Sequence, residues 1–339
     1  MASQFVYNTA SIAKILTPSL ITRALLESKI AKFFARLDSS ALDSLSSRLR
    51  FYHRISTPFA ITPLESPKHC ERLGTYAPHY GRIKDSYKWR AFSTYHYDMR
   101  SYARYFDQNL KLYYGFGDVN YYFTHPAITK SRPIRSSQNS ILLKLAQNRH
   151  FVFIKDPYGF KDKQDMIFFR GACYQEHRAR FLHKFFDAPF CDIGHTGNPR
   201  VHTPYLKPKV SIAKHLPYKF LLSLEGNDVA SNLKWVLSSN SLCMMPRPKY
   251  ETWFMESTLE PNVHYCEIAD DYSDVEEKFE FFRTHTEAAE EIIHNAHRFC
   301  ARFLDKRTEE MLNILVLRKY FCLSGQISIS AIEREFFGL

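Results

Sequence analysis

The chain has 339 residues, and its 46 lysines and arginines outnumber its 35 aspartates and glutamates, giving a formal net charge of +11 at pH 7. Hydrophobic residues make up 45% and charged residues 24%, a balance that excludes disordered and fibrous proteins. At about 100–200 residues per domain, this length predicts about two domains. The 7 cysteines are scattered without a CxxC pair, which predicts buried, reduced thiols.

No uncharged run reaches the roughly 20 apolar residues that a membrane span needs. The first residues lack the charged and then apolar segments of a secretory signal, so we expect a cytoplasmic protein. The net charge would attract nucleic acid, anionic lipid or phosphorylated substrates, and it does not choose among them. The basic residues are dispersed and form no recognisable nucleic-acid module, so no nucleic-acid partner is expected.

The first predicted elements are two amphipathic helices. Apolar residues recur at helical spacing over residues 26–37, interleaved with basic residues, and again over residues 42–52. Basic helices of this kind pack against other helices, form an interface between copies of a chain, or lie on an anionic membrane surface. The sequence leaves these alternatives open. Residues 56–90, rich in proline, histidine and aromatics, are expected to be irregular.

From about residue 110, short apolar runs alternate with helical patterns. Strands are expected at 112–116, 151–154, 167–169, 219–224, 241–245 and 263–268, and helices at 176–186, 230–237 and from about 273 into the 320s. This alternation predicts an α/β fold with a mainly parallel sheet. Ligands bind such sheets beyond the carboxyl ends of the strands, so the loops that follow strands are the candidate sites.

The loop after residues 112–116 carries Asp118, beside an aromatic run at 121–123. A carboxylate in this position can act as a general base toward a hydroxyl group. A turn or helix-cap aspartate is the alternative reading. Other carboxylates compete for the role of base: Asp98, Asp107 and Asp156.

Two further strand-end loops point to anion binding. The first carries Arg170 and Gly171, with Arg178 in the following helix. Arginine offers a planar fork to phosphate and glycine permits close backbone approach, although surface arginines are common. The second loop runs into a helix, whose first N–H groups bind anions, and it does not match a Walker loop. Its candidate residues are Glu225, Gly226, Asn227, Asp228, Val229, Ala230, Ser231, Asn232 and Lys234.

Several familiar catalytic motifs are absent from the sequence. No DxD triplet occurs, which weakens the case for a metal-held nucleotide diphosphate. His294 and His297 lack the rest of a zinc motif, and there is no GxSxG elbow. We therefore expect no metal site and no cofactor.

Several of these segments, in this order, resemble glycosyltransferase family 90, which includes Rumi-type protein O-glucosyltransferases, fungal capsule-associated proteins and bacterial lipopolysaccharide-type transferases. The similarity covers roughly residues 110–320 and is closest to the bacterial branch. The segments that carry it are 117–119, 130–133, 168–171 with Arg178, 218–235, 246–253, 260–265, 270–274 and 295–296.

The resemblance implies a GT-B architecture, with two facing Rossmann-like domains and a cleft between them. It implies an inverting, metal-independent transfer from a UDP-sugar. Asp118 would deprotonate the acceptor, while Arg170 and Arg178 would stabilise the diphosphate or shape its pocket. Backbone N–H groups around Val229, Ala230 and Ser231 would cradle the diphosphate, with Asn232 and Lys234 completing the site.

The sequence departs from the protein-modifying relatives at two positions. Asn232 and Cys173 stand where those relatives carry arginines. Lys234, together with Arg247 or Lys249, would then supply the missing positive charge.

Together these features predict an acceptor-side domain over residues 1–160, a nucleotide-sugar-binding domain over 161–310 and a helical tail over 311–339. The expected reaction moves a sugar from a UDP-sugar to a lipopolysaccharide core or related surface glycan, at the inner face of the cytoplasmic membrane. Anionic lipid is an expected partner surface. The alternatives are a cytosolic protein or small-glycan O-glycosyltransferase and, in another class, a polyanion-binding protein on a degenerate transferase fold, whose binding would depend steeply on salt.

Overall fold

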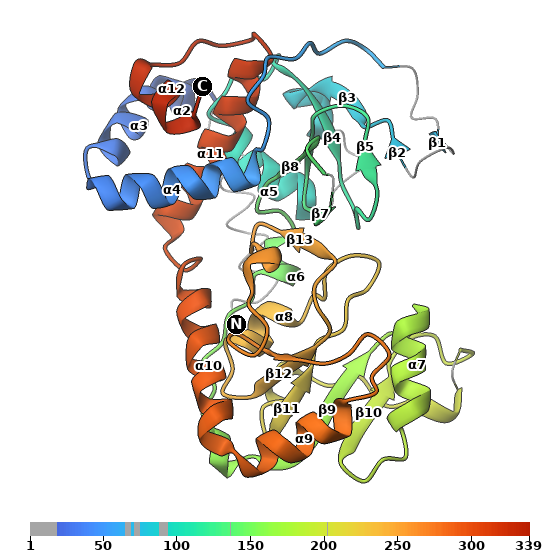
Figure 1. The fold of residues 1–339 in the computed structure, drawn as a ribbon. Helices are drawn as coiled ribbons and strands as arrows, with labels where there is room; N and C mark the ends of the chain where they lie inside the picture. The colour runs from blue at the N-terminus through green and yellow to red at the C-terminus, as the bar shows by residue number, and fades with distance from the viewer. Residues whose placement is uncertain (1–18, 65–68, 71–74, 88–93, 136, 202) are drawn as a thin grey trace. The chain divides into compact units, whose positions relative to one another are not determined.

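The computed structural model describes residues 19–64, 69–70, 75–87, 94–135, 137–201 and 203–339. The chain divides into two compact units (Figure 1). Unit 1 comprises Met1–Asn148, Tyr250–Met255 and Asp305–Leu339, and unit 2 comprises Arg149–Lys249 and Glu256–Leu304. The three-part division expected from the sequence stays a prediction.

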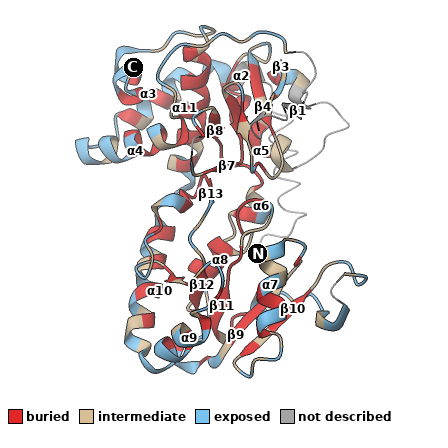
Figure 2. Ribbon diagram, turned by 45° about the vertical axis from the view of Figure 1, so that its right-hand side comes forward, coloured by how far each residue is buried: buried red, intermediate tan, exposed pale blue. Residues whose placement is uncertain are grey.

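Unit 2 is built on a parallel five-stranded sheet with the order β10-β9-β11-β12-β14. β11 and β12 are buried at nearly every residue (Figure 2), as expected for parallel strands covered on both faces. α7 packs against β10, and α10 packs against β12 and α8. The strands are β9 (Gln164–Gly171), β10 (Cys191–His195), β11 (Tyr218–Leu222), β12 (Leu242–Met245) and β14 (Cys266–Glu267). The helices are α7 (Glu176–Phe185), α8 (Leu233–Leu237), α9 (Val275–Thr284) and α10 (Thr286–Ala301), with short 3-10 turns at Phe160–Asp162, Thr203–Tyr205, Ile212–Lys214 and Glu256–Thr258.

Unit 1 combines helices with a four-stranded sheet of order β3-β4-β6-β8, in which β3 is antiparallel to β4 and the other pairs are parallel. α11, almost entirely buried, packs against α4 and α5, and α12 packs against α4. The strands of this sheet are β3 (His79–Arg82), β4 (Lys111–Gly115), β6 (Ala127–Thr129) and β8 (Ser140–Leu142). The helices are α2 (Ser19–Ala24), α3 (Leu26–Phe34), α4 (Ser39–Tyr52), α5 (Thr94–Ala103), α11 (Lys306–Leu323) and α12 (Ala331–Phe337), with α6 (Gln147–His150) at the junction with unit 2.

Two smaller ladders complete unit 1. β7 (Ser131–Pro133) pairs antiparallel with β13 (Tyr250–Thr252), which attaches the segment 250–255 to this unit. A second ladder joins β1 (His69–Cys70), β2 (Thr75–Tyr76) and β5 (Tyr122–Phe123), and a 3-10 turn spans Ile83–Tyr87. Among the described residues, no helix is both long and apolar enough to cross a membrane.

The structure confirms the α/β class with a parallel sheet, and it corrects several local predictions. Residues 151–154 form no strand; the N–H of Ile154 donates to the Ser238 hydroxyl at 3.1 Å instead of to a neighbouring strand. α8 begins only at Leu233, because the preceding residues form a turn in which Leu233 N–H donates to the carbonyl of Ala230. β3 lies in the stretch expected to be irregular, and its polar sequence His-Tyr-Gly-Arg gave no apolar pattern.

Glu309 is the centre of a buried ion cluster in unit 1. Its carboxylate accepts hydrogen bonds from Arg48 at 2.6 Å, from Lys144 at 2.9 Å and from the Trp253 indole at 2.7 Å. The Trp253 ring also stacks on Tyr52, with 3.7 Å between ring centroids. Because Trp253 belongs to the segment 250–255, Glu309 joins that segment to α4 and α11.

We expect Glu309→Gln to destabilise unit 1 by about 3 kcal/mol, because it leaves the Arg48 and Lys144 cations buried without a countercharge. Amide hydrogen exchange in α4 and α11 measures the loss. Glu310→Gln is the matched control: the Glu310 side chain is 34% exposed and pairs with Lys29, so its loss should cost about 1 kcal/mol or less. Equal protection in the two variants would contradict this assignment.

His53 is a fully buried imidazole in unit 1, and neither ring nitrogen has a hydrogen-bond partner among the described residues. Burial, aided by the nearby Lys319 cation, holds the pKa of His53 well below its ordinary value. Below about pH 6.5 His53 therefore binds a proton in the unfolded chain but stays neutral in the folded chain, and the free energy of unfolding falls as pH is lowered.

We expect His53→Phe to remove part of this acid sensitivity. The variant should gain stability relative to the unsubstituted protein as pH falls from 7 to 5, by up to about 1.4 kcal/mol per pH unit. Urea unfolding at several pH values measures the difference. Curves that stay parallel over this range would show that His53 does not titrate as its burial requires.

Candidate active site

The strand order of unit 2 defines a topological switch point. From β9 the chain first adds β10 on one side and then adds β11, β12 and β14 on the other. The crevice at such a reversal, beyond the carboxyl ends of the strands, is where open α/β sheets bind ligands. Here it lies between the loop after β9, residues 172–175, and the loop after β11, residues 223–232. These are the two loops that the sequence marked for anion binding.

Arg178, on α7, ties these two loops together. Its guanidinium donates to the carbonyl oxygen of Ala172 at 2.9 Å in the first loop. In the second loop it donates to the carbonyl oxygens of Leu224 and Glu225, at 2.6 and 2.7 Å. Burial lowers the pKa of Arg178 from its ordinary value. Since these bonds occupy the guanidinium fork, Arg178 sets the spacing of the loops.

Hydrogen bonds fix the second loop, residues 223–232, along its length. Glu225 accepts from the N–H of Lys249 at 3.0 Å, and the Asn227 side chain accepts from Gln175 at 2.9 Å. Gly226 N–H donates to the carbonyl of Asp228 at 2.9 Å, and a side chain at Gly226 would lie within 3.4 Å of the Arg178 guanidinium.

At the far end of this loop, the Asn232 side chain donates to the carbonyl of Leu222 at 3.0 Å and accepts from the Ser223 hydroxyl at 3.2 Å. Between these hydrogen-bonded positions, the backbone N–H groups of Val229, Ala230 and Ser231 donate to no residue in the described part of the chain. Backbone N–H groups in succession form anion-binding concavities. Because α8 has only five residues, these loop amides are the main donors here, and the helix dipole adds little.

Two predicted phosphate ligands are engaged elsewhere in unit 2. Arg170 pairs with Asp192 at 2.6 Å and donates to the carbonyl oxygens of Phe169 and Asp192. Lys234 is fully buried and forms an ion pair with Glu256. Each cation would have to leave its carboxylate to reach a phosphate.

Three further predicted residues also have defined neighbours. Gly171 lies under the Phe169 ring, where a side chain would come within 2.5 Å. The substitute cations Arg247 and Lys249 are exposed and pair with Glu267 at 2.9 Å and with Asp270 at 3.1 Å.

Asp118 lies in unit 1, in the loop after β4. The preceding Gly117 has φ +128°, a conformation that favours glycine. The carboxylate pairs with the ammonium of Lys130 at 2.9 Å, and its side chain is 29% exposed while Lys130 is buried. Lys130 follows β6, the parallel neighbour of β4, so both residues leave the same edge of the sheet. The ion pair therefore orients a carboxylate that solvent still reaches.

Comparison with known proteins decides the family. The model of Glycosyl transferase family 90 matches residues 154–321. The chain is 40% identical to O-glucosyltransferase LpsA of Dichelobacter nodosus over 291 residues, which cover 86% of either chain. The chain belongs to glycosyltransferase family 90. A weaker similarity, 26% identity over 111 residues, relates 30% of this chain to 9% of uncharacterized protein 179R of Invertebrate iridescent virus 6.

The family 90 match includes both loops at the switch point, whereas Asp118 precedes it.

The carboxylates that compete with Asp118 for the role of base are engaged in structural contacts. Asp98 is buried and accepts from the Gln147 backbone and side chain. The buried Asp156 side chain pairs with Lys163 at 2.6 Å, and Asp107 pairs with Arg23 at 3.0 Å. Asp107 is as open to solvent as Asp118 but precedes β4, whereas Asp118 follows β4 at the carboxyl end of the strand, where such sheets bind ligands, so Asp118 stays the candidate base.

Sequence reasoning missed two residues of this candidate site. Lys130 was noted only as part of a motif, because the short strand before it, β6, was not among the strands expected from the sequence. His177 approaches the carbonyl of Glu225 at 2.7 Å, and burial lowers its pKa. No sequence signal marked it. Among the described residues, no three His, Cys, Asp or Glu side chains gather as metal ligands would, and the metal-free mechanism stays a prediction.

Proposed function

We propose that this family 90 transferase moves glucose from UDP-glucose to a lipopolysaccharide core or a related surface glycan, by an inverting, metal-independent displacement. The central observation is the pair of loops that Arg178 joins at the switch point, with three successive N–H groups between fixed ends that have no partner in the part of the chain that the structure describes. The name of the Dichelobacter relative, an O-glucosyltransferase, supports glucose as the sugar.

On the donor side, the N–H groups of Val229, Ala230 and Ser231 hold the diphosphate. When the bond from the anomeric carbon to the diphosphate oxygen breaks, negative charge grows on that oxygen. Fixed backbone dipoles stabilise this charge without having to reorganise. Arg178 acts as a positioning residue, since its contacts are to the loop carbonyls.

On the acceptor side, Asp118 takes the proton of the acceptor hydroxyl as its oxygen attacks the anomeric carbon from the face opposite the diphosphate. One displacement of this kind inverts the anomeric configuration. The proposal includes a GT-B architecture, with unit 2 as the nucleotide-sugar side and unit 1 as the acceptor side. It also includes action at the inner face of the cytoplasmic membrane.

UDP release from a panel of UDP-sugars, measured in the presence of EDTA, tests this function. We expect slow hydrolysis of UDP-glucose even without acceptor, and no loss of rate in EDTA. Loss of activity in EDTA would overturn the metal-free mechanism. If no nucleotide sugar bound while polyanions bound with a steep salt dependence, the polyanion-binding alternative would replace the proposal. Faster turnover with a peptide than with a lipid-linked glycan would favour the protein-modifying alternative.

A further inference from the structure

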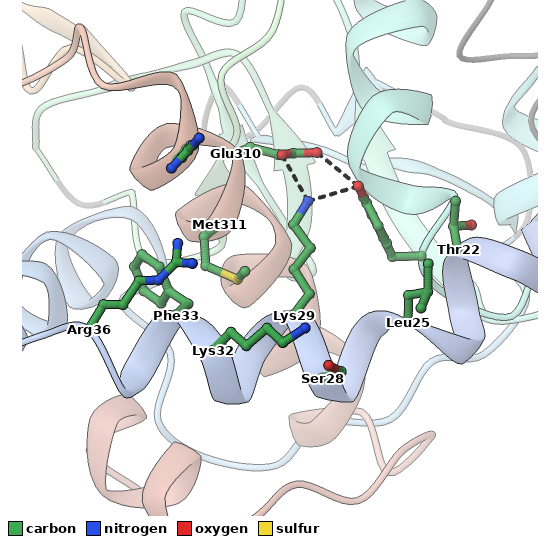
Figure 3. Close-up of a pocket in the computed structure, with 11 residues that line it drawn as sticks. Thr22, Leu25, Ser28, Lys29, Lys32, Phe33, Arg36, Glu310 and Met311 are labelled. Carbon is green, nitrogen blue, oxygen red and sulfur yellow. Dashed lines mark hydrogen bonds and ion pairs between the residues drawn. The ribbon is translucent and has the colours of Figure 1, made fainter.

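Unit 1 contains a pocket of about 540 Å³ whose lining includes none of the residues assigned to the reaction. The lining consists of Thr22 of α2, residues of α3 and its two ends, Tyr105 and the start of α11 (Figure 3). Its apolar wall includes Leu25, Phe33 and Met311. Lys32, Arg36 and Arg307 also line it, and all three are exposed. The pocket thus combines an apolar wall with a cationic rim.

No ion pair among the described residues offsets the positive charge of this rim, although the Asp305 carboxylate accepts from the backbone N–H of Arg307 at 3.1 Å. Glu310, the one carboxylate of the lining, is already bound to Lys29 at 2.8 Å and to the Tyr105 hydroxyl at 3.0 Å. Lys32, Arg36 and Arg307 form no ion pair with any described residue. Lys32 lies on α3 and Arg36 lies two residues after its end, and both line the pocket together with Arg307. Like charges gathered around one pocket repel, and a bound anion would relieve this repulsion.

The apolar wall limits which class of anion this pocket can bind. Leu25, directly before α3, keeps 57% of its surface exposed, although it is a large apolar side chain. Free phosphate or a nucleic-acid backbone would use the three cations and leave Leu25 and Phe33 in water. A phospholipid satisfies both features, since its phosphate meets the cations and its acyl-glycerol part meets the apolar side chains.

We propose that this pocket docks the protein on an anionic phospholipid bilayer, with Lys32, Arg36 and Arg307 at the headgroup phosphates and Leu25 inserted beside them. The inference rests on the proposed function only in that a lipid-linked acceptor lies in the same bilayer. Vesicle binding is measured without donor or acceptor, and UDP-glucose hydrolysis is measured without vesicles, so either claim can fail alone.

Co-sedimentation of the full-length chain with vesicles tests the proposal. Vesicles of phosphatidylcholine with 30% phosphatidylglycerol are compared with phosphatidylcholine alone, and we expect binding only to the former. Each basic residue near an anionic surface is worth about fivefold in binding. The triple variant Lys32→Gln/Arg36→Gln/Arg307→Gln should therefore bind about 100-fold more weakly. Because these side chains are exposed, the variant should melt at the same temperature as the unsubstituted protein.

The matched control is Arg200→Gln/Lys209→Gln/Lys214→Gln, which removes the same charge from exposed residues of unit 2. Its affinity for the vesicles should stay within about threefold of that of the unsubstituted protein. An equal loss of binding in both triple variants would show that net charge alone, and not this pocket, accounts for the binding. Leu25→Gln should weaken binding at least fivefold with the charge unchanged. Full binding by Leu25→Gln, displacement by millimolar inorganic phosphate, or a dimer that Leu25→Gln dissociates would overturn the proposal.

Discussion

Asp118→Asn is expected to lower the rate of sugar transfer by 10²–10⁴-fold, the usual contribution of a general base, while UDP affinity changes less than twofold. Asparagine keeps the shape of the side chain and an oxygen for Lys130, but it cannot take the acceptor proton. Steady-state kinetics with UDP-glucose, together with calorimetric titration of UDP, separates the two effects.

The control for Asp118 is Asp107→Asn, another partly exposed carboxylate of unit 1 with a cationic partner. Its activity should stay within twofold of that of the unsubstituted protein. If Asp118→Asn turns over normally, the base is a different group and the assignment of the acceptor side is wrong.

Arg178→Met should weaken UDP binding at least tenfold and lower kcat/KM about 100-fold. The substitution removes three hydrogen bonds that hold the two switch-point loops, and a displacement of about 1 Å at a binding loop costs about this much. Arg178→Lys should recover only part of the loss, because a single ammonium cannot reproduce a planar fork. UDP titration and kinetics measure both variants, and circular dichroism monitors the fold.

Arg180→Met provides a matched control two residues further along α7. Arg180 is exposed, and its hydrogen bond to the carbonyl of Asp270 is long, at 3.4 Å. This variant should bind UDP normally. Normal UDP binding by Arg178→Met would mean that the spacing of the loops does not matter for the donor.

Much of the fold was predictable because the sheet of unit 2 is buried on both faces. The predicted strands at 219–224 and 241–245 contain the unbroken apolar runs 220–222 and 242–245, and they correspond to β11 and β12. Periodicity failed where pairing depends on distant partners. Residues 151–154 are apolar but pair with no strand, and β3 is polar but pairs with β4 through its backbone.

The candidate site shows the same limit. The sequence indicated which loops follow strands, and the structure brings those of β9 and β11 to the switch point. The sequence did not indicate that Arg170 and Lys234 have carboxylate partners, because those partners, Asp192 and Glu256, each lie 22 residues further along the chain. The sequence also suggested that Arg178 is a phosphate ligand. Its bonds to the carbonyls of Ala172 and Leu224 could not be predicted, because they depend on how α7 packs.

A crystal structure of the protein with bound UDP tests the central claim most directly. We predict that diphosphate oxygens lie about 2.7–3.2 Å from the backbone nitrogens of Val229, Ala230 and Ser231, with the bonds of Arg178 to the loop carbonyls intact. A diphosphate bound elsewhere, for example by Arg247 and Lys278 beyond β14, would contradict the account, as would one held by Arg178 itself after it has released the loops.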